Sequence, residues 1–203
     1  MSMYLISNNC VGSSLYALNG LQFNHPFVWG AFDLDDFVYL ANNYNKINFK
    51  NVKFSLETRL YQTRKSVICD IDSRIKYHFS HYMQDDLMDE PGRNDTYKHT
   101  ILYKYAPILA QEKYDRRLQR MDGEPTFLYC FNLIKTTSKE YLIILDRLLT
   151  IRRKLIIVIH ESKDIGDRKI PDNVTLLRLP DEQMVLCANI VANVLNPLYN
   201  FNK

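Results

Sequence analysis

Cys10 is the residue whose type and setting most favour chemistry. It follows an apolar run at residues 3–6 and the polar residues Ser7, Asn8 and Asn9, and apolar residues at helical spacing come after it. A cysteine between a strand and the first turn of a helix meets backbone N–H groups that favour a thiolate and can hold an oxyanion. We therefore predict Cys10 as a nucleophile, with Asn8 and Asn9 as substrate-binding amides. The alternative is a small buried cysteine in a turn.

A nucleophilic cysteine needs a base, and the chain has five histidines. His78 and His81 fall on opposite faces of the strand predicted at residues 74–81, because side chains alternate along a strand. His81 ends that strand just before the loop-like residues 84–98, where catalytic groups commonly lie, and we predict it as the base. His160 ends a later apolar strand and is a second candidate, because ligands bind at the carboxyl ends of parallel strands. The alternative for each is a histidine without a catalytic role.

Three arginines lie close together near the end of a predicted helix. Arg116 and Arg120 share a face at a spacing of four residues, and Arg117 lies between them. Paired guanidinium groups suit a phosphate or a carboxylate, so we predict all three as substrate-binding residues. The alternative is a solvated helix face that pairs with Glu112 and Asp115.

No metal site is predicted. The acidic groups at residues 33–36 and 85–86 have no histidine or cysteine at ligand spacing. The four cysteines lie between 57 and 61 residues apart, which matches neither a zinc site nor a dense disulfide framework. The chain also has no glycine-rich phosphate loop. We therefore expect reduced thiols and no required cofactor, with coenzyme A as one acyl donor that such chemistry could use.

The elements that would position these residues predict an α/β domain. Apolar strands alternate with amphipathic helices, which is typical of a mainly parallel sheet flanked by helices on both faces. A different middle region predicts a small antiparallel edge or side sheet. The strands expected in the parallel sheet are residues 3–7, 125–131, 154–160 and 173–179, and those of the antiparallel part are residues 52–56, 66–71 and 74–81.

Between the strands, helical spacing and end signals predict the helices. Residues 23–32 read as an irregular aromatic stretch, and residues 84–98 as a mobile loop around Pro91 and Gly92. Besides the helix after Cys10, helices are expected at about residues 33–44, 109–121, 138–152 and 181–195.

Length and composition narrow the classes of protein. The chain has 203 residues, of which 46% are hydrophobic and 24% charged, which suits a single globular domain. Its net charge of +3 is too mild to predict a nucleic-acid partner. No apolar run approaches the roughly 20 residues of a membrane span, and the first residues do not resemble a signal peptide. We expect a cytoplasmic protein without an integral membrane segment.

A family resemblance adds to this reading. Residues 5–29 resemble the opening of an uncharacterised bacterial family of papain-like cysteine peptidases, with further likeness at the FSHY element and the KYDRRLQRM segment. The same SNNC and FSHY elements resemble a neighbouring uncharacterised family found in bacterial exopolysaccharide and O-antigen gene clusters. The likeness covers most of the first 130 residues. The residues of the opening that carry it are Asn9, Cys10, Gly20, Leu21, Pro26, Phe27 and Trp29.

The resemblance implies that Cys10 and His81 form a catalytic pair. Papain-like enzymes keep their base on an antiparallel sheet, whereas this chain predicts parallel strands after residue 125. We therefore carry over the Cys/His pair without the papain fold, since such pairs recur on unrelated folds.

Three functions follow from these features. The first is an acyl transferase or hydrolase of surface-polysaccharide biosynthesis that acts on a small molecule or a sugar phosphate. The second is a non-catalytic accessory protein that binds a sugar or a nucleotide. The third is a glycosyltransferase-like enzyme, which a parallel sheet suits.

Overall fold

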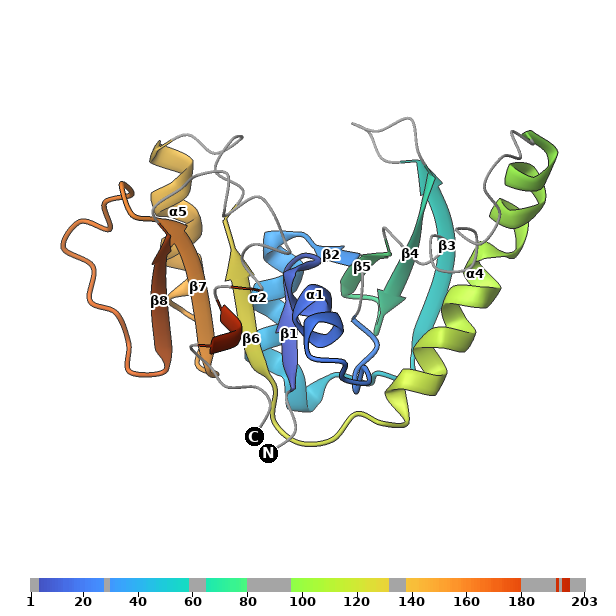
Figure 1. The fold of residues 1–203 in the computed structure, drawn as a ribbon, viewed down its shortest axis with the longest axis horizontal. Helices are drawn as coiled ribbons and strands as arrows, with labels where there is room; N and C mark the ends of the chain where they lie inside the picture. The colour runs from blue at the N-terminus through green and yellow to red at the C-terminus, as the bar shows by residue number, and fades with distance from the viewer. Residues whose placement is uncertain are drawn as a thin grey trace.

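The fold is α/β and is built on two separate four-stranded sheets (Figure 1). A computed structural model describes residues 4–27, 30–58, 65–79, 96–131, 138–179, 193 and 195–197. The first sheet is parallel, with strand order β1-β6-β7-β8. Its strands are β1 (Leu5–Ser7), β6 (Thr126–Cys130), β7 (Leu155–His160) and β8 (Val174–Leu179). These are the four strands that the sequence predicts for the parallel sheet.

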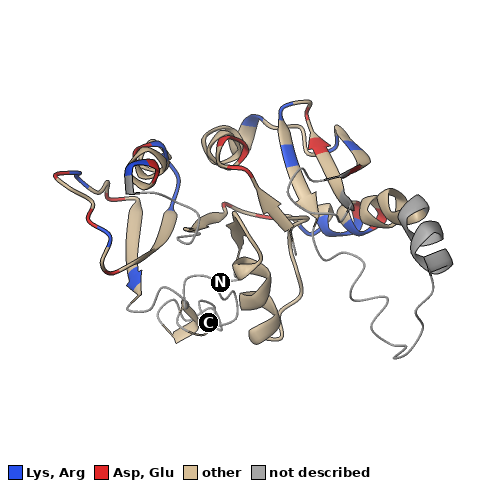
Figure 2. Ribbon diagram, turned by 90° about the horizontal axis from the view of Figure 1, so that it is seen from above, with Lys and Arg blue, Asp and Glu red and all other residues tan. Residues whose placement is uncertain are grey.

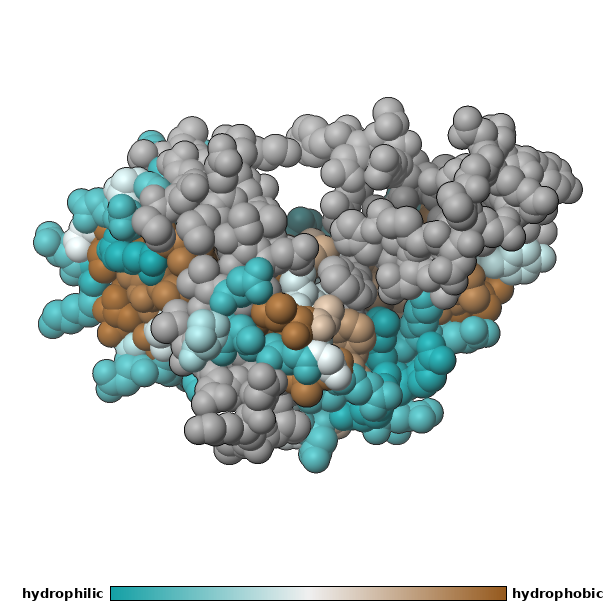
Figure 3. Space-filling model, in the orientation of Figure 1, coloured by the Kyte–Doolittle hydropathy of each residue, from teal (hydrophilic) through white to brown (hydrophobic). Residues whose placement is uncertain are grey.

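Helices cover both faces of the parallel sheet. Helix α1 (Val11–Leu18) lies on one face, and α2 (Leu34–Asn43) and α5 (Ser138–Leu148) lie on the other (Figure 2). Strand β7 is buried along nearly its whole length, as expected of a central parallel strand rich in branched residues. On the side from which α1 is seen, Figure 3 shows hydrophobic residues gathered over β7 and β8.

The second sheet is antiparallel, with strand order β2-β5-β4-β3. Its strands are β2 (Gly30–Phe32), β3 (Val52–Thr58), β4 (Lys65–Ile71) and β5 (Ile75–Phe79). Asp72 and Ser73 join β4 to β5 with positive φ angles of 54° and 55°, as in the tight hairpin turns that match strand twist. Helix α4 (Thr96–Leu118) packs on β3 and β4, and the Phe54 and Tyr114 rings lie 5.6 Å apart in that contact.

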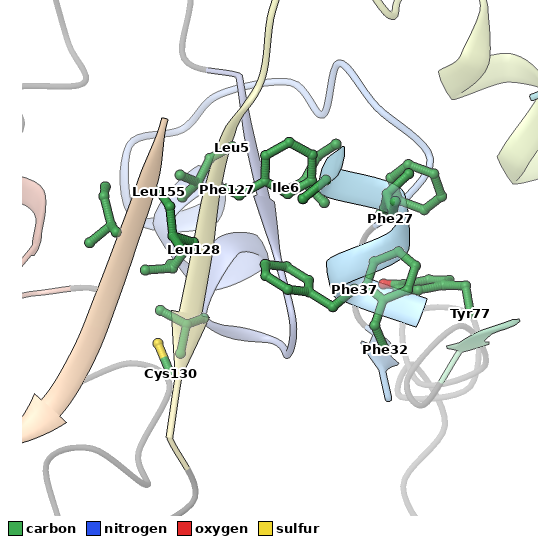
Figure 4. Packing of buried hydrophobic residues seen from close by; sticks show 14 of the residues in the cluster. Leu5, Ile6, Phe27, Phe32, Phe37, Tyr77, Phe127, Leu128, Cys130 and Leu155 are labelled. Atoms are coloured by element: carbon green, nitrogen blue, oxygen red, sulfur yellow. The ribbon is translucent and has the colours of Figure 1, made fainter. Parts of the chain in front are cut away.

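One aromatic core joins the two sheets. The ring of Phe37 on α2 lies 5.7 Å from Phe127 in the parallel sheet and 6.3 Å from Phe32 in the antiparallel sheet (Figure 4). The Phe32 ring in turn lies 4.6 Å from the Tyr77 ring, measured between centroids. Because buried rings bridge the sheets without a break, the side sheet is packed against the rest of the molecule rather than attached to it by a linker.

Several boundaries differ from the sequence prediction. Strand β2 includes residues 30–32 of the stretch 23–32 that was expected to be irregular. Its first residue, Gly30, has a low propensity for β-strands, so the sequence pattern does not predict this strand. Helix α4 begins at Thr96, whereas a start near residue 109 and a loop through residue 98 were expected. Pro107 usually marks the end or start of a helix, but α4 continues through it.

The remaining differences from the predicted boundaries are small or concern residues outside the described ranges. Helix α4 ends at Leu118, and α5 ends four residues before the predicted end. Helix α2 is followed by a 3₁₀ turn, η1 (Tyr44–Lys46). Most of the loop predicted at 84–98 and most of the helix predicted at 181–195 lie outside the described residues. Within the described ranges, no helix has both the length and the apolar character needed to cross a membrane.

Candidate active site

Cys10 lies just beyond the carboxyl end of β1, which is the edge strand of the parallel sheet. The parallel strands β6, β7 and β8 extend from one side of β1, whereas the chain after β1 passes through α1 into β2 of the antiparallel sheet on the other side (Figure 1). The carboxyl ends of parallel strands are where α/β proteins bind ligands. Cys10 is the residue immediately before α1, and its carbonyl accepts the Ser14 N–H at 3.0 Å. The strand, turn and helix predicted around Cys10 are therefore present.

The amide of Asn9 builds the turn that presents Cys10. Its Oδ1 accepts the Val11 N–H at 3.0 Å and the Ser7 hydroxyl at 3.2 Å. The Ser7 Oγ in turn accepts the Asn9 N–H at 3.4 Å. A side chain that bonds the backbone two residues ahead fixes a turn of this kind. Asn9 thus positions Cys10 at the start of α1, and its substrate-binding role stays a prediction.

Asn8 fastens the turn to the neighbouring strand. Its Oδ1 accepts the Cys130 N–H at 2.8 Å, and its Nδ2 donates to the Cys130 carbonyl at 3.2 Å. Its backbone N–H donates to Leu128, and its carbonyl accepts the Phe32 N–H at 3.1 Å. Asn8 therefore joins β1 to β6 and also to β2 of the other sheet. No local sequence pattern predicts these bonds, because Cys130 is 122 residues away in the chain. The substrate-binding role of Asn8 stays a prediction.

The thiol of Cys10 faces β2. Its Sγ lies 3.9 Å from the Gly30 carbonyl oxygen, and the residue is half-buried. A Cβ at position 30 would lie 2.5 Å from the Tyr77 hydroxyl, so only glycine fits beside that ring. Tyr77 is fully buried, and this burial raises its pKa well above the usual range, with a smaller contribution from Cys10. A neutral phenol and a backbone carbonyl thus line this side of the thiol.

The other described thiols differ from Cys10. Cys69 and Cys130 are buried, and desolvation raises the pKa of both well above the ordinary value. Cys10 alone among these three is partly exposed. Because the thiolate is the reactive form, Cys10 is the best placed of the described thiols for nucleophilic chemistry.

The predicted base, His81, lies outside the described residues. Two residues at alternate positions before it in β5, Tyr77 and Phe79, are buried. His78 points to the other face of the strand, and its Nε2 lies 3.6 Å from the Asp33 carboxylate. His78 is therefore not directed to the Cys10 side of the sheet. The alternation predicted from the sequence is confirmed as far as Phe79.

His160 lies at the same edge of the parallel sheet as Cys10. It is the last residue of β7. Its Nδ1 accepts a hydrogen bond from the Ser162 N–H at 3.1 Å and lies 2.6 Å from the Ser162 hydroxyl oxygen. The register places His160 on the sheet face shared by Ser7 and α1. It remains a second candidate for the base.

His25 has a structural setting. It is buried among the rings of Tyr4, Tyr16 and Phe27, and its Nδ1 accepts the Phe27 N–H at 3.2 Å. Desolvation, with Arg117 as a lesser cause, lowers the pKa of His25 to about 3. His25 is thus a neutral core residue at physiological pH.

The structure does not bring the three arginines to the Cys10 turn. The end of α4 lies toward the amino-terminal edge of the parallel sheet, where β6 begins, whereas Cys10 follows the carboxyl end of β1 (Figure 1). Arg116 is exposed, and the Arg117 guanidinium lies 5.3 Å from the ring centroid of Phe23. Arg120 is half-buried, and its Nε has no hydrogen-bond partner. Substrate binding by these three residues stays a prediction.

No metal centre is evident in the part of the chain that the structure describes, where no three histidine, cysteine or acidic side chains are grouped as ligands. Comparison with known proteins gives no match to a curated protein. Residues 1–90, which contain Cys10 and both β1 and the antiparallel sheet, match the model of one protein family. Over that part the chain is similar to a domain of unknown function, DUF1919.

Proposed function

We propose that this protein is a cysteine-dependent acyl transferase or hydrolase, with Cys10 as nucleophile and His81 as base. The observation that carries the proposal is the place of Cys10: a partly exposed residue at the start of α1, just beyond the carboxyl end of the parallel strand β1. The resemblance to papain-like peptidases supplies the reaction class. The likeness to a family of exopolysaccharide gene clusters supplies the setting, which is bacterial surface-polysaccharide assembly in the cytoplasm.

In the first half of the reaction, the Cys10 sulfur attacks the carbonyl carbon of an ester or thioester while His81 takes the thiol proton. The negative charge that develops on the carbonyl oxygen is stabilised by N–H groups in the first turn of α1. When the intermediate collapses, the bond to the alcohol or thiol leaving group breaks, and the leaving group takes its proton from His81. The acyl group is then held on Cys10 as a thioester.

In the second half, water or a sugar hydroxyl attacks the thioester, and His81 takes the proton of the attacking oxygen. The carbon–sulfur bond breaks and the thiolate takes that proton back, so that Cys10 and His81 return to their starting forms. Water gives a hydrolase, and a sugar hydroxyl gives a transferase. The Asn8 and Asn9 amides contribute by holding the turn in place through both steps.

The arginines would hold an anionic part of the substrate away from the reacting bond. Arg116 and Arg117 lie in the last turn of α4 and Arg120 in the turn after it, so they suit a long donor with phosphates, such as a nucleotide, a lipid carrier or coenzyme A. In a binding assay with coenzyme A, Arg116→Ala and Arg120→Ala should weaken affinity and leave the melting temperature nearly unchanged. A loss of several kcal/mol in the free energy of unfolding would instead make these residues structural.

Thiol labelling tests the central claim. Purified protein is treated with iodoacetamide between pH 6 and pH 9, and the rate at each cysteine is followed by mass spectrometry. Cys10 should react well below pH 8.5 and faster than Cys69 and Cys130, which are buried. Cys10→Ser removes the fast site and serves as the control. If Cys10 reacts no faster than the buried cysteines, the nucleophile proposal is wrong.

An acyl-transfer assay separates the enzyme from the accessory protein. Incubation with p-nitrophenyl acetate and with acetyl-coenzyme A should leave an acetyl group on Cys10 in wild type and none in Cys10→Ser. His81→Ala should slow this acetylation, and His160→Ala should not. The opposite result for the two histidine variants would transfer the role of base to His160.

A further inference from the structure

An open surface groove runs along the outer side of α2, on the sheet face opposite α1, and is lined by charged, amide and apolar groups. Its volume is about 420 Å³, which is within the range of small-molecule sites. Its floor is α2, one wall is the turn between β4 and β5, and the other wall is α5, which stands beside α2 (Figure 2). The lining residues are Asp35, Asp36, Val38, Tyr39, Asn42, Asn43, Arg74 and Arg147.

The cationic groups of the groove are held in place on both walls. Arg74 donates to the Tyr39 hydroxyl at 2.9 Å, and its guanidinium carbon lies 6.0 Å from the Tyr39 ring centroid. On the other wall, Arg147 forms an ion pair with Asp35. These two guanidinium groups therefore present oriented N–H donors to the space between them.

The floor supplies a hydrogen-bond acceptor and a donor. Asp36 is half-buried at the start of α2, where it accepts the backbone N–H of Lys76, and its burial raises the pKa of the carboxyl group. A partly buried carboxyl group with a perturbed pKa in a concave site is typical of binding and catalytic sites. Asn42 adds an amide whose Oδ1 accepts the Arg152 N–H at 3.2 Å, which orients its Nδ2 as a donor.

The chemistry of this lining selects among ligand classes. The carboxylates of Asp35 and Asp36 repel a phosphate or another anion, and Arg74 and Arg147 repel a cation. A hydrocarbon would bury the charged groups without a partner. A ligand rich in hydroxyl groups suits the groove, because each hydroxyl group both donates and accepts and can therefore bond carboxylates, amides and guanidinium groups in turn.

We propose that this groove binds a small, uncharged polyhydroxylated ligand of the size of a pyranose sugar. The hydroxyl groups lie against Asp36, Asn42 and Arg147, and the C–H surface of the ring lies against Val38 and Tyr39. The site is separate from Cys10 and does not depend on the reaction proposed there.

The test is a titration of ¹⁵N-labelled protein, followed by amide chemical shifts. The probes are the methyl pyranosides of glucose, galactose and mannose, with glycine and inorganic phosphate as zwitterionic and anionic comparators. At least one pyranoside should shift the amide signals of Tyr39, Asn42 and Arg147 at millimolar concentration, and neither comparator should match it. These chemical-shift changes are measured on the wild-type protein, so this part of the test does not depend on whether a variant folds.

Matched variants sharpen the result. Arg147→Met should weaken pyranoside binding about tenfold or more, because the ligand loses hydrogen bonds to a charged group, whereas Lys53→Met at an exposed position of β3 should leave it unchanged. Cys10→Ser should also bind normally, which separates failure of this proposal from failure of the enzyme proposal. The groove proposal is wrong if no pyranoside binds there, if glycine or phosphate binds more tightly, or if Lys53→Met weakens binding as much as Arg147→Met.

Discussion

The two helices that leave the junction of the sheets begin in opposite ways. Helix α1 follows Cys10, has no acidic residue in its first turn, and is buried over its first six residues. Helix α2 follows Asp33, carries Asp35 and Asp36 in its first turn, and begins beside an exposed carboxylate. Carboxylates at a helix start compensate the partial positive charge of the backbone N–H groups there. A helix start without carboxylates leaves this partial charge available to a bound anion.

This difference assigns different chemistry to the two helix starts. The start of α1 suits a developing anion, as an oxyanion on a substrate bound to Cys10 would be. The start of α2 repels an anion and suits hydroxyl groups that donate to carboxylates. The following predictions can break or sharpen this contrast, from the largest expected effect to the smallest.

The largest effect is expected at Cys10 itself. Cys10→Ser should reduce acyl transfer by about 10³-fold or more, because the weaker hydroxyl nucleophile replaces the thiolate. The side chain is half-buried and similar in size, so the melting temperature should change by no more than about 2 °C. Steady-state kinetics and a thermal melt measure the two quantities. Retained activity in Cys10→Ser would show that the start of α1 has no catalytic role.

The second largest effect is expected at Gly30, which backs the Cys10 thiol. Gly30→Ala would place a methyl group 2.5 Å from the Tyr77 hydroxyl, and the backbone of His78 is equally close. Since the ring is buried and cannot move away, the free energy of unfolding should fall by about 3 kcal/mol in urea denaturation. Ala17→Gly, on the exposed side of α1, should cost about 1 kcal/mol and is the comparison. Equal costs at the two positions would mean that Tyr77 does not fix the wall of the site.

The clasp made by Asn8 comes next. Asn8→Leu removes two hydrogen bonds to Cys130 and leaves its N–H and carbonyl without those partners, so we expect a loss of about 2 kcal/mol. Asn45→Leu is the matched control, because Asn45 is exposed and bonds only a surface carboxylate at 3.3 Å among the contacts described. Asn8→Leu should also slow iodoacetamide labelling of Cys10 if the clasp orients the turn. A variant as stable as wild type would contradict the structural role of Asn8.

His25 gives a pH-dependent effect on the buried side of α1. Its pKa is about 3 in the fold and about 6.5 when unfolded, so the unfolded chain binds more protons between these values. Stability should therefore fall as the pH drops below about 6.5, by roughly 2 kcal/mol at pH 5. His25→Asn keeps an acceptor for the Phe27 N–H and should abolish that part of the loss. Urea denaturation at pH 7 and pH 5 compares the two proteins, and an equal loss in both would refute this account.

These contacts also show what the sequence could and could not predict. Alternation of apolar strands and helices predicted the parallel sheet, because strands such as β7 are buried along nearly their whole length and need no distant partner to be recognised. The position of Cys10 at a strand–helix turn followed from the same local pattern. Local pattern could not reveal β2, whose three residues are defined by pairing with β5, nor the bonds from Asn8 to Cys130. Contacts between segments far apart in the chain set these features.

The same limit explains the arginines. Spacing predicts Arg116 and Arg120 on one helix face, but α4 ends at Leu118, so Arg120 lies in the turn beyond the helix. Spacing also cannot say which end of the sheet the helix approaches. Helix α4 ends near the start of β6, so the arginines lie away from the carboxyl edge that holds Cys10. The groove along α2 was missed for a related reason, since Arg74 and Arg147 come from turns and helices far apart in the chain and meet only in the fold.

The smallest effect is expected at the start of α2. Asp35→Asn removes the charge that pairs with Arg147, but both side chains are substantially exposed, so the free energy of unfolding should fall by only about 0.3–1 kcal/mol. Raising the salt concentration to 1 M should shrink this difference, because exposed charges are screened. Asp167→Asn, an exposed acidic residue outside a helix, is the control and should change stability even less. A loss of more than 2 kcal/mol in the free energy of unfolding that salt does not reduce would mean that the start of α2 contributes to stability as a buried site does. The contrast between the two helix starts would then fail.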